Sequence, residues 1–248
     1  MDGLSLESLG LFLVAAFVGG LTSGIAGFAM GLVVSGVWLH IITPVQTATL
    51  IVGYGLLTQG YGIWKLRHAL DWHLVAPYII GGAFGVPLGT MLLTYVDPVS
   101  LRIGMGLLLI AYSIWGLARP AFRPIKATKT ADVVVGFLNG WLGGLTGLVG
   151  ITVTIWCQLR GMTKDAQRAV FQPVTLAAAA LSLVTLGLAG AVTVPTVKLY
   201  LLGTPLMLAG LWSGFKLYGK LDDEAFRNVI LLLLLASGIV LLVPKSMS

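Results

Sequence analysis

The chain has 248 residues, of which 57% are hydrophobic and 10% are charged, and its mean hydropathy is +0.97. This composition excludes a large independent soluble domain and indicates an integral membrane protein. The single cysteine, Cys157, excludes an internal disulfide and a cysteine metal cluster. The net charge of +6 indicates basic cytoplasmic loops rather than a nucleic-acid partner.

The predicted elements are all helices, and most are long enough to cross a membrane. No Asp, Glu, Lys or Arg occurs from Ser8 to Trp64, so this stretch holds at least two passes of about 20 residues each. Charges, prolines and glycines divide the whole chain into eight apolar segments. These segments are predicted at Leu9–Ile42, Pro44–Trp64, His73–Tyr95, Ser100–Leu117, Val133–Leu159, Ala166–Leu188, Thr196–Phe215 and Ala225–Val243.

The chain reads as two related halves, residues 1–118 and 132–248, joined by a basic linker at residues 119–131. Similar residues follow one another in the same order in both halves, which favours an internal repeat over chance. The matched pairs are Gly20 with Gly136, Gly24 with Gly140, Gly27 with Gly143, Gly31 with Gly147, Gly85 with Gly210, Gly89 with Gly214, Asp97 with Asp222 and Arg102 with Arg227.

The first segment of each half is predicted to be a helical hairpin bent at its glycines. Leu9–Ile42 would be about 51 Å long as a straight helix, well beyond a membrane core of about 30 Å. For Val133–Leu159 the loop charges distinguish a single span from a hairpin. Eight simple spans divide the Lys and Arg residues eight to seven between the two sides of the membrane. A hairpin at Val133–Leu159 instead puts twelve of the fifteen on one side. The two repeats, each a hairpin plus three transmembrane helices, are then inverted, with both chain ends outside and the linker in the cytoplasm.

The bends predict a central anion site, because the second arm of each hairpin begins there and directs unpaired N–H groups into the protein. Neutral hydrogen-bonding side chains stand near the bends and within the following helices. An alternative is that the small residues only pack helices closely and that Thr22 and Ser23 bond their own helix. The predicted substrate-binding residues are Thr22, Ser23, Gly24, Gly27, Phe28, Gln46, Tyr54, Asn139, Gly140, Gly143, Gly144, Thr146 and Gln172.

The paired segments "GGLTSGIAGFAMG" and "GFLNGWLGGLTGLVG", with the run "GVPLGTMLLTYVDPVSLRIGMGLLLIAYSIWG" and the short basic linker, resemble the TauE/SafE sulfite-exporter family, also called TSUP. The resemblance covers Leu9 to Val243. It implies a secondary transporter, usually an exporter, of sulfite or of organosulfonates such as sulfoacetate across the prokaryotic inner membrane. The first half departs from the glycine pattern at 28–30, where Phe, Ala and Met replace the Gly, Leu and Thr of 144–146. This difference predicts either unequal roles for the two halves or a larger or more apolar substrate on one side.

The sequence carries no sign of an enzyme. It has no G-x-x-x-x-G-K-[ST] phosphate loop, and its three histidines fall near segment ends, where they cannot activate Ser23. We therefore expect no cofactor and no metal, with a small sulfur oxyanion or organosulfonate and membrane lipid as the partners. A homo-oligomer is compatible with the sequence. Two other functions stay open: an anion channel on the same scaffold, and a structural membrane subunit.

Overall fold

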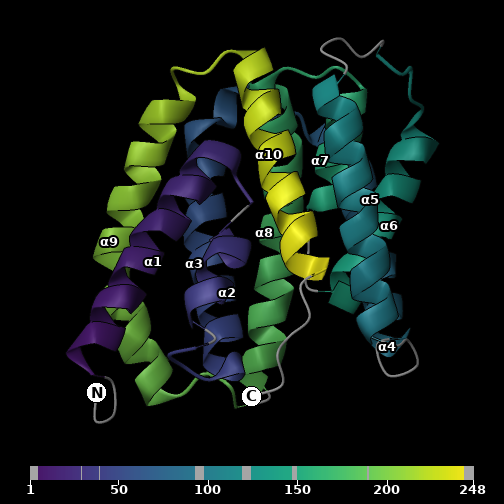
Figure 1. The fold of residues 1–248 in the computed structure, drawn as a ribbon. Coiled ribbons are helices and arrows are strands. Elements are labelled where there is room, and N and C mark those ends of the chain that lie inside the picture. The colour runs from purple at the N-terminus through teal and green to yellow at the C-terminus, as the bar shows by residue number, and fades with distance from the viewer. Residues whose placement is uncertain are drawn as a thin grey trace. The chain divides into compact units, whose positions relative to one another are not determined.

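The computed structural model describes residues 5–28, 30–38, 40–92, 98–118, 124–146, 150–188 and 190–242, and every regular element in these ranges is a helix (Figure 1). Three of the described helices, the first, eighth and ninth, are long and apolar enough to cross a membrane. The α-helices are α1 (Leu6–Ala26), α2 (Met30–Trp38), α3 (Pro44–Lys65), α4 (Trp72–Leu92), α5 (Pro98–Ala118), α6 (Lys129–Thr146), α7 (Ile151–Leu159), α8 (Lys164–Leu188), α9 (Val194–Tyr218) and α10 (Asp223–Leu242), and a short 3₁₀ helix covers Arg67–Ala69.

The helices pack into two compact units, and each unit draws on both halves of the sequence. Unit 1 is Met1–His68 with Thr175–Leu221, and unit 2 is Ala69–Val174 with Asp222–Ser248. Helix α8 contributes its first part to unit 2 and its last part to unit 1. This division follows packing, whereas the boundaries predicted at 118 and 132 follow the sequence repeat, and the repeat as a domain division stays a prediction.

Unit 1 contains the first hairpin, in which α1 and α2 pack together, and places it beside α3 and α9. Ser5 caps α1 by accepting a hydrogen bond from the Ser8 backbone N–H, and Gly27 ends that helix in the left-handed conformation. Helix α3 begins at Pro44 with a capping box between Thr43 and Gln46. These caps fix where the long apolar run is broken into three helices.

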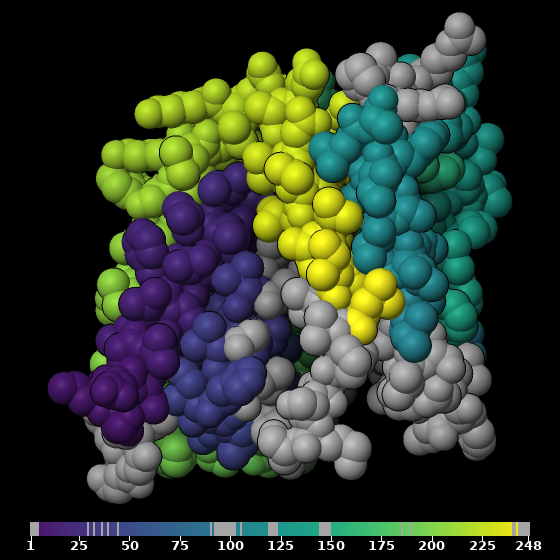
Figure 2. Space-filling view, viewed as in Figure 1, coloured from purple at the N-terminus to yellow at the C-terminus, as the bar shows by residue number. Residues whose placement is uncertain are grey.

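Unit 2 contains the second hairpin, α6 and α7, with α4, α5 and α10. Helix α4 packs along α6, and α5 packs along α10 (Figure 1). In the space-filling view α5 and α10 lie against each other on the visible face (Figure 2). Their close approach requires small residues, because a Cβ on Gly238 would lie 2.8 Å from the carbonyl oxygen of Gly106.

The two long predicted segments are each a pair of helices. Leu9–Ile42 divides into α1 and α2, and Val133–Leu159 falls within α6 and α7. The second arms, α2 and α7, have 9 residues each, which gives about 14 Å of helix. That length is about half of a membrane core. The excess length of the first segment and the loop charges around the second thus predicted breaks between helices that the structure contains.

Each unit has a seam where two glycine-bearing helices pack backbone against backbone. In unit 1 the seam joins α1 to α9, and in unit 2 it joins α6 to α4. A Cβ added at any seam glycine would lie under 3.0 Å from a backbone atom of the facing helix. The seam glycines are Gly20, Gly24, Gly210 and Gly214 in unit 1, and Gly81, Gly85, Gly136 and Gly140 in unit 2.

The seams match each other residue by residue and correct one part of the predicted pairing. A Cβ on Gly210 would meet the carbonyl of Phe17, and one on Gly81 would meet the carbonyl of Val133. Val133 lies 116 residues after Phe17, the same offset that relates Gly20 to Gly136. In α4, the predicted partners of Gly210 and Gly214 were therefore placed one helix turn too late in the sequence. The pairs are Gly81 with Gly210 and Gly85 with Gly214, in place of Gly85 with Gly210 and Gly89 with Gly214.

Candidate functional site

The bend of the first hairpin is held by an amide side chain from α3. Gly27 has φ of 89°, a conformation that favours glycine, and its N–H donates to the Ser23 carbonyl at 2.8 Å. Its carbonyl accepts a hydrogen bond of 2.7 Å from Nε2 of Gln59. Gln59 is 3% exposed, and its other amide atom, Oε1, is buried without a hydrogen-bond partner. This bend therefore has one buried hydrogen-bond acceptor that is not satisfied.

The bend of the second hairpin is held by an amide side chain from its own first arm. Gly150 has φ of 96° and begins α7, and its N–H donates to Oδ1 of Asn139 at 2.9 Å. The N-cap residue of α7 is Gly150, which has no side chain to cap the helix, so among the described residues no N-cap side chain accepts from the N–H groups of the first turn. Asn139 is 2% exposed. This bend therefore presents hydrogen-bond donors, the groups that an anion requires.

The open end of the first hairpin is closed by aromatic side chains. The indole Nε1 of Trp38, at the end of α2, donates to the Phe12 carbonyl in α1 at 3.3 Å. The two rings stack with centroids 4.9 Å apart. Tyr54 of α3 lies against Trp38 at 5.9 Å and donates its hydroxyl hydrogen to the Tyr200 carbonyl at 2.7 Å. An uncharged, fully buried cluster thus joins the hairpin to α3 and α9.

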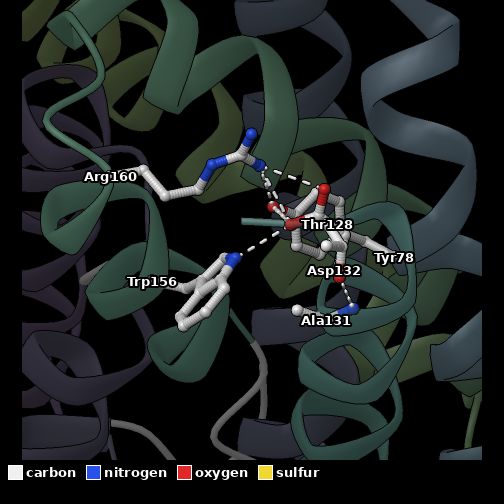
Figure 3. Close-up of polar contacts among 6 residues, drawn as sticks. All are labelled: Tyr78, Thr128, Ala131, Asp132, Trp156 and Arg160. Atoms are coloured by element: carbon white, nitrogen blue, oxygen red, sulfur yellow. Dashed lines mark hydrogen bonds and ion pairs between the residues drawn. The ribbon is translucent and has the colours of Figure 1, made fainter. Parts of the chain in front are cut away.

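The open end of the second hairpin is closed by an ion pair (Figure 3). Nη1 of Arg160, just after α7, lies 2.9 Å from Oδ1 of Asp132 in α6. The same carboxylate oxygen accepts from the Tyr78 hydroxyl at 2.7 Å and from the Trp156 indole at 2.9 Å. Asp132 is 3% exposed. Three donors, one from α4, one from α7 and one from the residue that follows α7, therefore compensate one buried negative charge.

Arg160 remains positively charged at any accessible pH. Burial alone would lower its pKa, but the hydrogen bond with Tyr78 and the charge of Asp132 outweigh that cost, and the net pKa lies above the usual value. The guanidinium is partly exposed, with 20% of the side chain accessible. The ion pair is therefore a permanent link between the two arms rather than a group that titrates near neutral pH.

Unit 2 holds two further buried polar contacts near this end. Arg168 in α8 has no exposed surface, and Gln172, with its amide oxygen turned toward the guanidinium, accepts from Nη2 at 2.9 Å and from Nε at 3.3 Å. Oε1 of Gln158 in α7 accepts from the Tyr112 hydroxyl at 2.9 Å, while its Nε2 is buried without a partner. A membrane protein retains such groups at a cost, which marks them as functional candidates.

Comparison with known protein families identifies the family of this chain. The sequence model of the sulfite exporter TauE/SafE family matches residues 11–241. The chain belongs to the TauE/SafE family. No match was found among curated proteins or among solved structures. TauE/SafE membership confirms the resemblance found in the sequence and assigns the chain to membrane transporters of the sulfite-exporter type.

The structure distributes the residues predicted to bind substrate in this TauE/SafE protein over several environments. Gly27 and Asn139 lie at the bends, and Phe28 is half-buried directly after the first one. Gly24 and Gly140 lie inside helices at the seams, where they serve close packing. That these residues contact substrate stays a prediction.

Some of the remaining predicted residues make contacts that the sequence did not indicate. The surroundings of others lie outside the described residues. Thr22 donates its hydroxyl to the carbonyls of Val18 and Gly19 in its own helix, as the alternative reading of the sequence held. Gln46 belongs to the capping box at the start of α3. Ser23 and Gly143 are buried, Tyr54 and Gln172 make the contacts given above, and the surroundings of Gly144 and of the Thr146 side chain lie outside the described residues.

Sequence reasoning missed Gln59, Asp132 and Arg160. Asp132 and Arg160 stand at the borders of a predicted segment, where Arg160 counted only as a loop charge and Asp132 was given no role. A signal was present, because opposite charges at both ends of a predicted hairpin come together when the arms fold back. Gln59 has no such signal, since nothing in the sequence of α3 relates it to Gly27. In the described residues no group of three or more His, Cys, Asp or Glu residues is placed to hold a metal ion.

Proposed function

We propose that this TauE/SafE protein exports small sulfur-containing anions, such as sulfite or sulfoacetate-like organosulfonates, by alternating access. The observation that carries the proposal is the bend at Gly150. There, the uncapped N-terminus of α7 lies beside a buried asparagine that fixes the backbone of the bend. A helix N-terminus favours an anion by about 0.3–2 kcal/mol, in addition to the hydrogen bonds from its N–H groups.

The donors at this bend are neutral, which suits a transported anion that must also be released. Backbone N–H groups bind an oxyanion without a buried counter-charge that would hold it too tightly. Export also agrees with the membrane potential, because an anion leaving a cell that is negative inside gains about 2.3 kcal/mol per charge per 100 mV. Export therefore requires no coupled cation, and we propose uniport.

The proposal includes the orientation of the chain in a prokaryotic inner membrane. The two repeats run in opposite directions, both chain ends lie outside, and the linker is cytoplasmic, as the distribution of Lys and Arg favours. Lys126 in the linker is exposed, and the native Cys157 is buried, so an introduced thiol can be labelled without background. Lys126→Cys is expected to react with a membrane-impermeant maleimide only from the cytoplasmic side. Labelling of intact cells from outside would contradict this orientation.

The function is tested with purified protein in liposomes loaded with radiolabelled sulfite. A carrier is expected to show saturable counterflow, with unlabelled sulfite or sulfoacetate outside accelerating the exchange and acetate having no effect. Single-channel currents in place of counterflow would support an anion channel. Absence of both, in protein whose folding is verified by a cooperative melt, would support a structural subunit.

A further inference from the structure

Unit 1 has a strongly asymmetric distribution of charge along its helices. Four basic side chains, which we call the basic end, lie together near the C-terminal ends of α3 and α9. Tyr61 near the end of α3 packs against Phe215 near the end of α9, with ring centroids 5.2 Å apart, which places these helix ends side by side. All four basic side chains are exposed. The basic end consists of Lys65, Arg67, Lys216 and Lys220.

No acidic side chain of unit 1 balances the basic end. The acidic residues within unit 1 are Asp2 and Glu7, at the start of the chain. Residues 222–224 are acidic but belong to unit 2. There, Asp222 accepts from the Ala225 N–H at 2.7 Å and Asp223 accepts from the Lys164 N–H at 2.7 Å. Within unit 1 the basic end therefore has an excess of positive charge.

Exposed tryptophans stand directly beside these charges. Lys216 places Nζ 3.5 Å from the centroid of the Trp212 ring, and Arg67 places its guanidinium carbon 5.6 Å from the Trp64 ring. Trp64 is 58% exposed and Trp212 is 54% exposed. Tryptophan with Lys or Arg at the end of a membrane helix is typical of the level of the lipid head groups.

The surface at this end of α9 has an open hollow. It is lined by Ser213, Lys216 and Leu217 of α9 and by Lys220, two residues after the end of that helix. Lys216 and Lys220 therefore line the same hollow, and like charges that lie close together repel. An anion lying between them would relieve that repulsion.

The same face of α9 continues from the lysines as apolar surface. Leu208 and Trp212 precede Lys216 at intervals of four residues and are 41% and 54% exposed. A phosphate on the lysines would therefore be followed along the helix by surface suited to an acyl chain. We propose that the basic end of unit 1 binds an anionic phospholipid, with the head-group phosphate on Lys216 and Lys220 and an acyl chain along Trp212 and Leu208.

The proposal is tested on the full chain purified in neutral detergent, by native mass spectrometry and by thermal melting with added phosphatidylglycerol or phosphatidylcholine. Phosphatidylglycerol is expected to be retained and to raise the melting temperature, and phosphatidylcholine to do so much less. Lys216→Ala with Lys220→Ala is expected to weaken phosphatidylglycerol binding about thirty-fold, because each basic residue near an anionic surface contributes about 1 kcal/mol.

Two controls separate this site from general attraction. Lys198→Ala removes an exposed lysine near the N-terminal end of the same helix and is expected to leave binding unchanged. Inorganic phosphate at the same concentration is expected to have no effect. Equal retention of both lipids, unchanged binding in the double lysine variant, or equal stabilisation by inorganic phosphate through the same lysines would each overturn the proposal. The result does not depend on the proposed transport function, because the basic end includes none of its residues.

Discussion

The two hairpins, α1–α2 and α6–α7, have the same arrangement of helices but are held together by different side-chain contacts. Each is a longer helix followed by one of 9 residues, and each packs its first arm along a glycine seam. The first is closed at its open end by the stacked rings of Phe12 and Trp38, and the second by the ion pair of Asp132 and Arg160. The seam is thus the common element, and the closures and bends are where the halves differ.

The difference extends to the bends. The first bend has a buried acceptor without a partner, Oε1 of Gln59, whereas the second lies at the N-terminus of α7, where the N-cap glycine provides no side-chain acceptor for the N–H groups. Acceptors suit a proton donor or a cation, and donors suit an anion. This contrast supports the proposal that the anion binds at the second hairpin, in line with the unequal roles that the sequences at 28–30 and 144–146 predict.

The largest effect is expected from breaking the ionic closure of the second hairpin. Arg160→Met leaves the Asp132 carboxylate buried with only neutral donors, which is expected to lower the free energy of unfolding by about 3–5 kcal/mol. Adding Asp132→Asn, which keeps an acceptor for Tyr78 and Trp156, is expected to recover at least half of this loss. Denaturant unfolding in detergent measures both. A double variant as unstable as Arg160→Met would show that the charge pair is not the stabilising feature.

An intermediate and equal effect is expected in the two seams. Gly24→Ala puts a Cβ 2.5 Å from the Leu211 carbonyl, and Gly140→Ala puts one 2.6 Å from the Gly82 carbonyl. Each is expected to cost about 1–3 kcal/mol through overpacking. Gly10→Ala is the matched control in α1, because nothing lies within 4 Å of its Cβ position. The measurement is the melting temperature of each of the three variants. A seam variant with the same melting temperature as the control would contradict close packing at that seam.

The smallest effect is expected at the closure of the first hairpin. Trp38→Phe removes the indole N–H that donates to the Phe12 carbonyl but keeps an aromatic ring on the stack. We expect a loss of about 1 kcal/mol, the net value of one neutral hydrogen bond, with a small additional packing cost. Comparison with Arg160→Met under identical conditions shows whether the two closures differ as described. A loss as large as that of Arg160→Met would remove the distinction between them.

Much of the fold follows from the sequence because its signals are local. The first bend was predicted because Leu9–Ile42 is too long for one membrane crossing, and the second because a simple crossing at Val133–Leu159 leaves the Lys and Arg residues evenly divided. The glycines were harder to interpret. A glycine that breaks a helix, such as Gly27, and one that lets two helices touch, such as Gly24, look alike in a sequence because both tasks require a missing side chain.

The candidate site could be predicted only where side chains act on nearby backbone. Asn139 was identified because it lies next to the glycines of its own hairpin, and it does hold Gly150. Gln59 was missed because it reaches Gly27 from another helix, and that packing depends on tertiary structure. Gln46 was chosen for its amide group, yet the same group completes the capping box with Thr43, a local interaction that the sequence Thr-x-x-Gln already allows.

The central claim is that the anion binds at the second bend, and one measurement tests it most directly. Thermal melts of the wild type and of Asn139→Asp are compared over a sulfite titration. Aspartate keeps an oxygen to accept from the Gly150 N–H but places a negative charge beside the uncapped end of α7. At 100 times its dissociation constant, sulfite is expected to stabilise the wild type by about 2.7 kcal/mol and to leave the folded variant without a response. Equal stabilisation of both proteins would contradict anion binding at this bend.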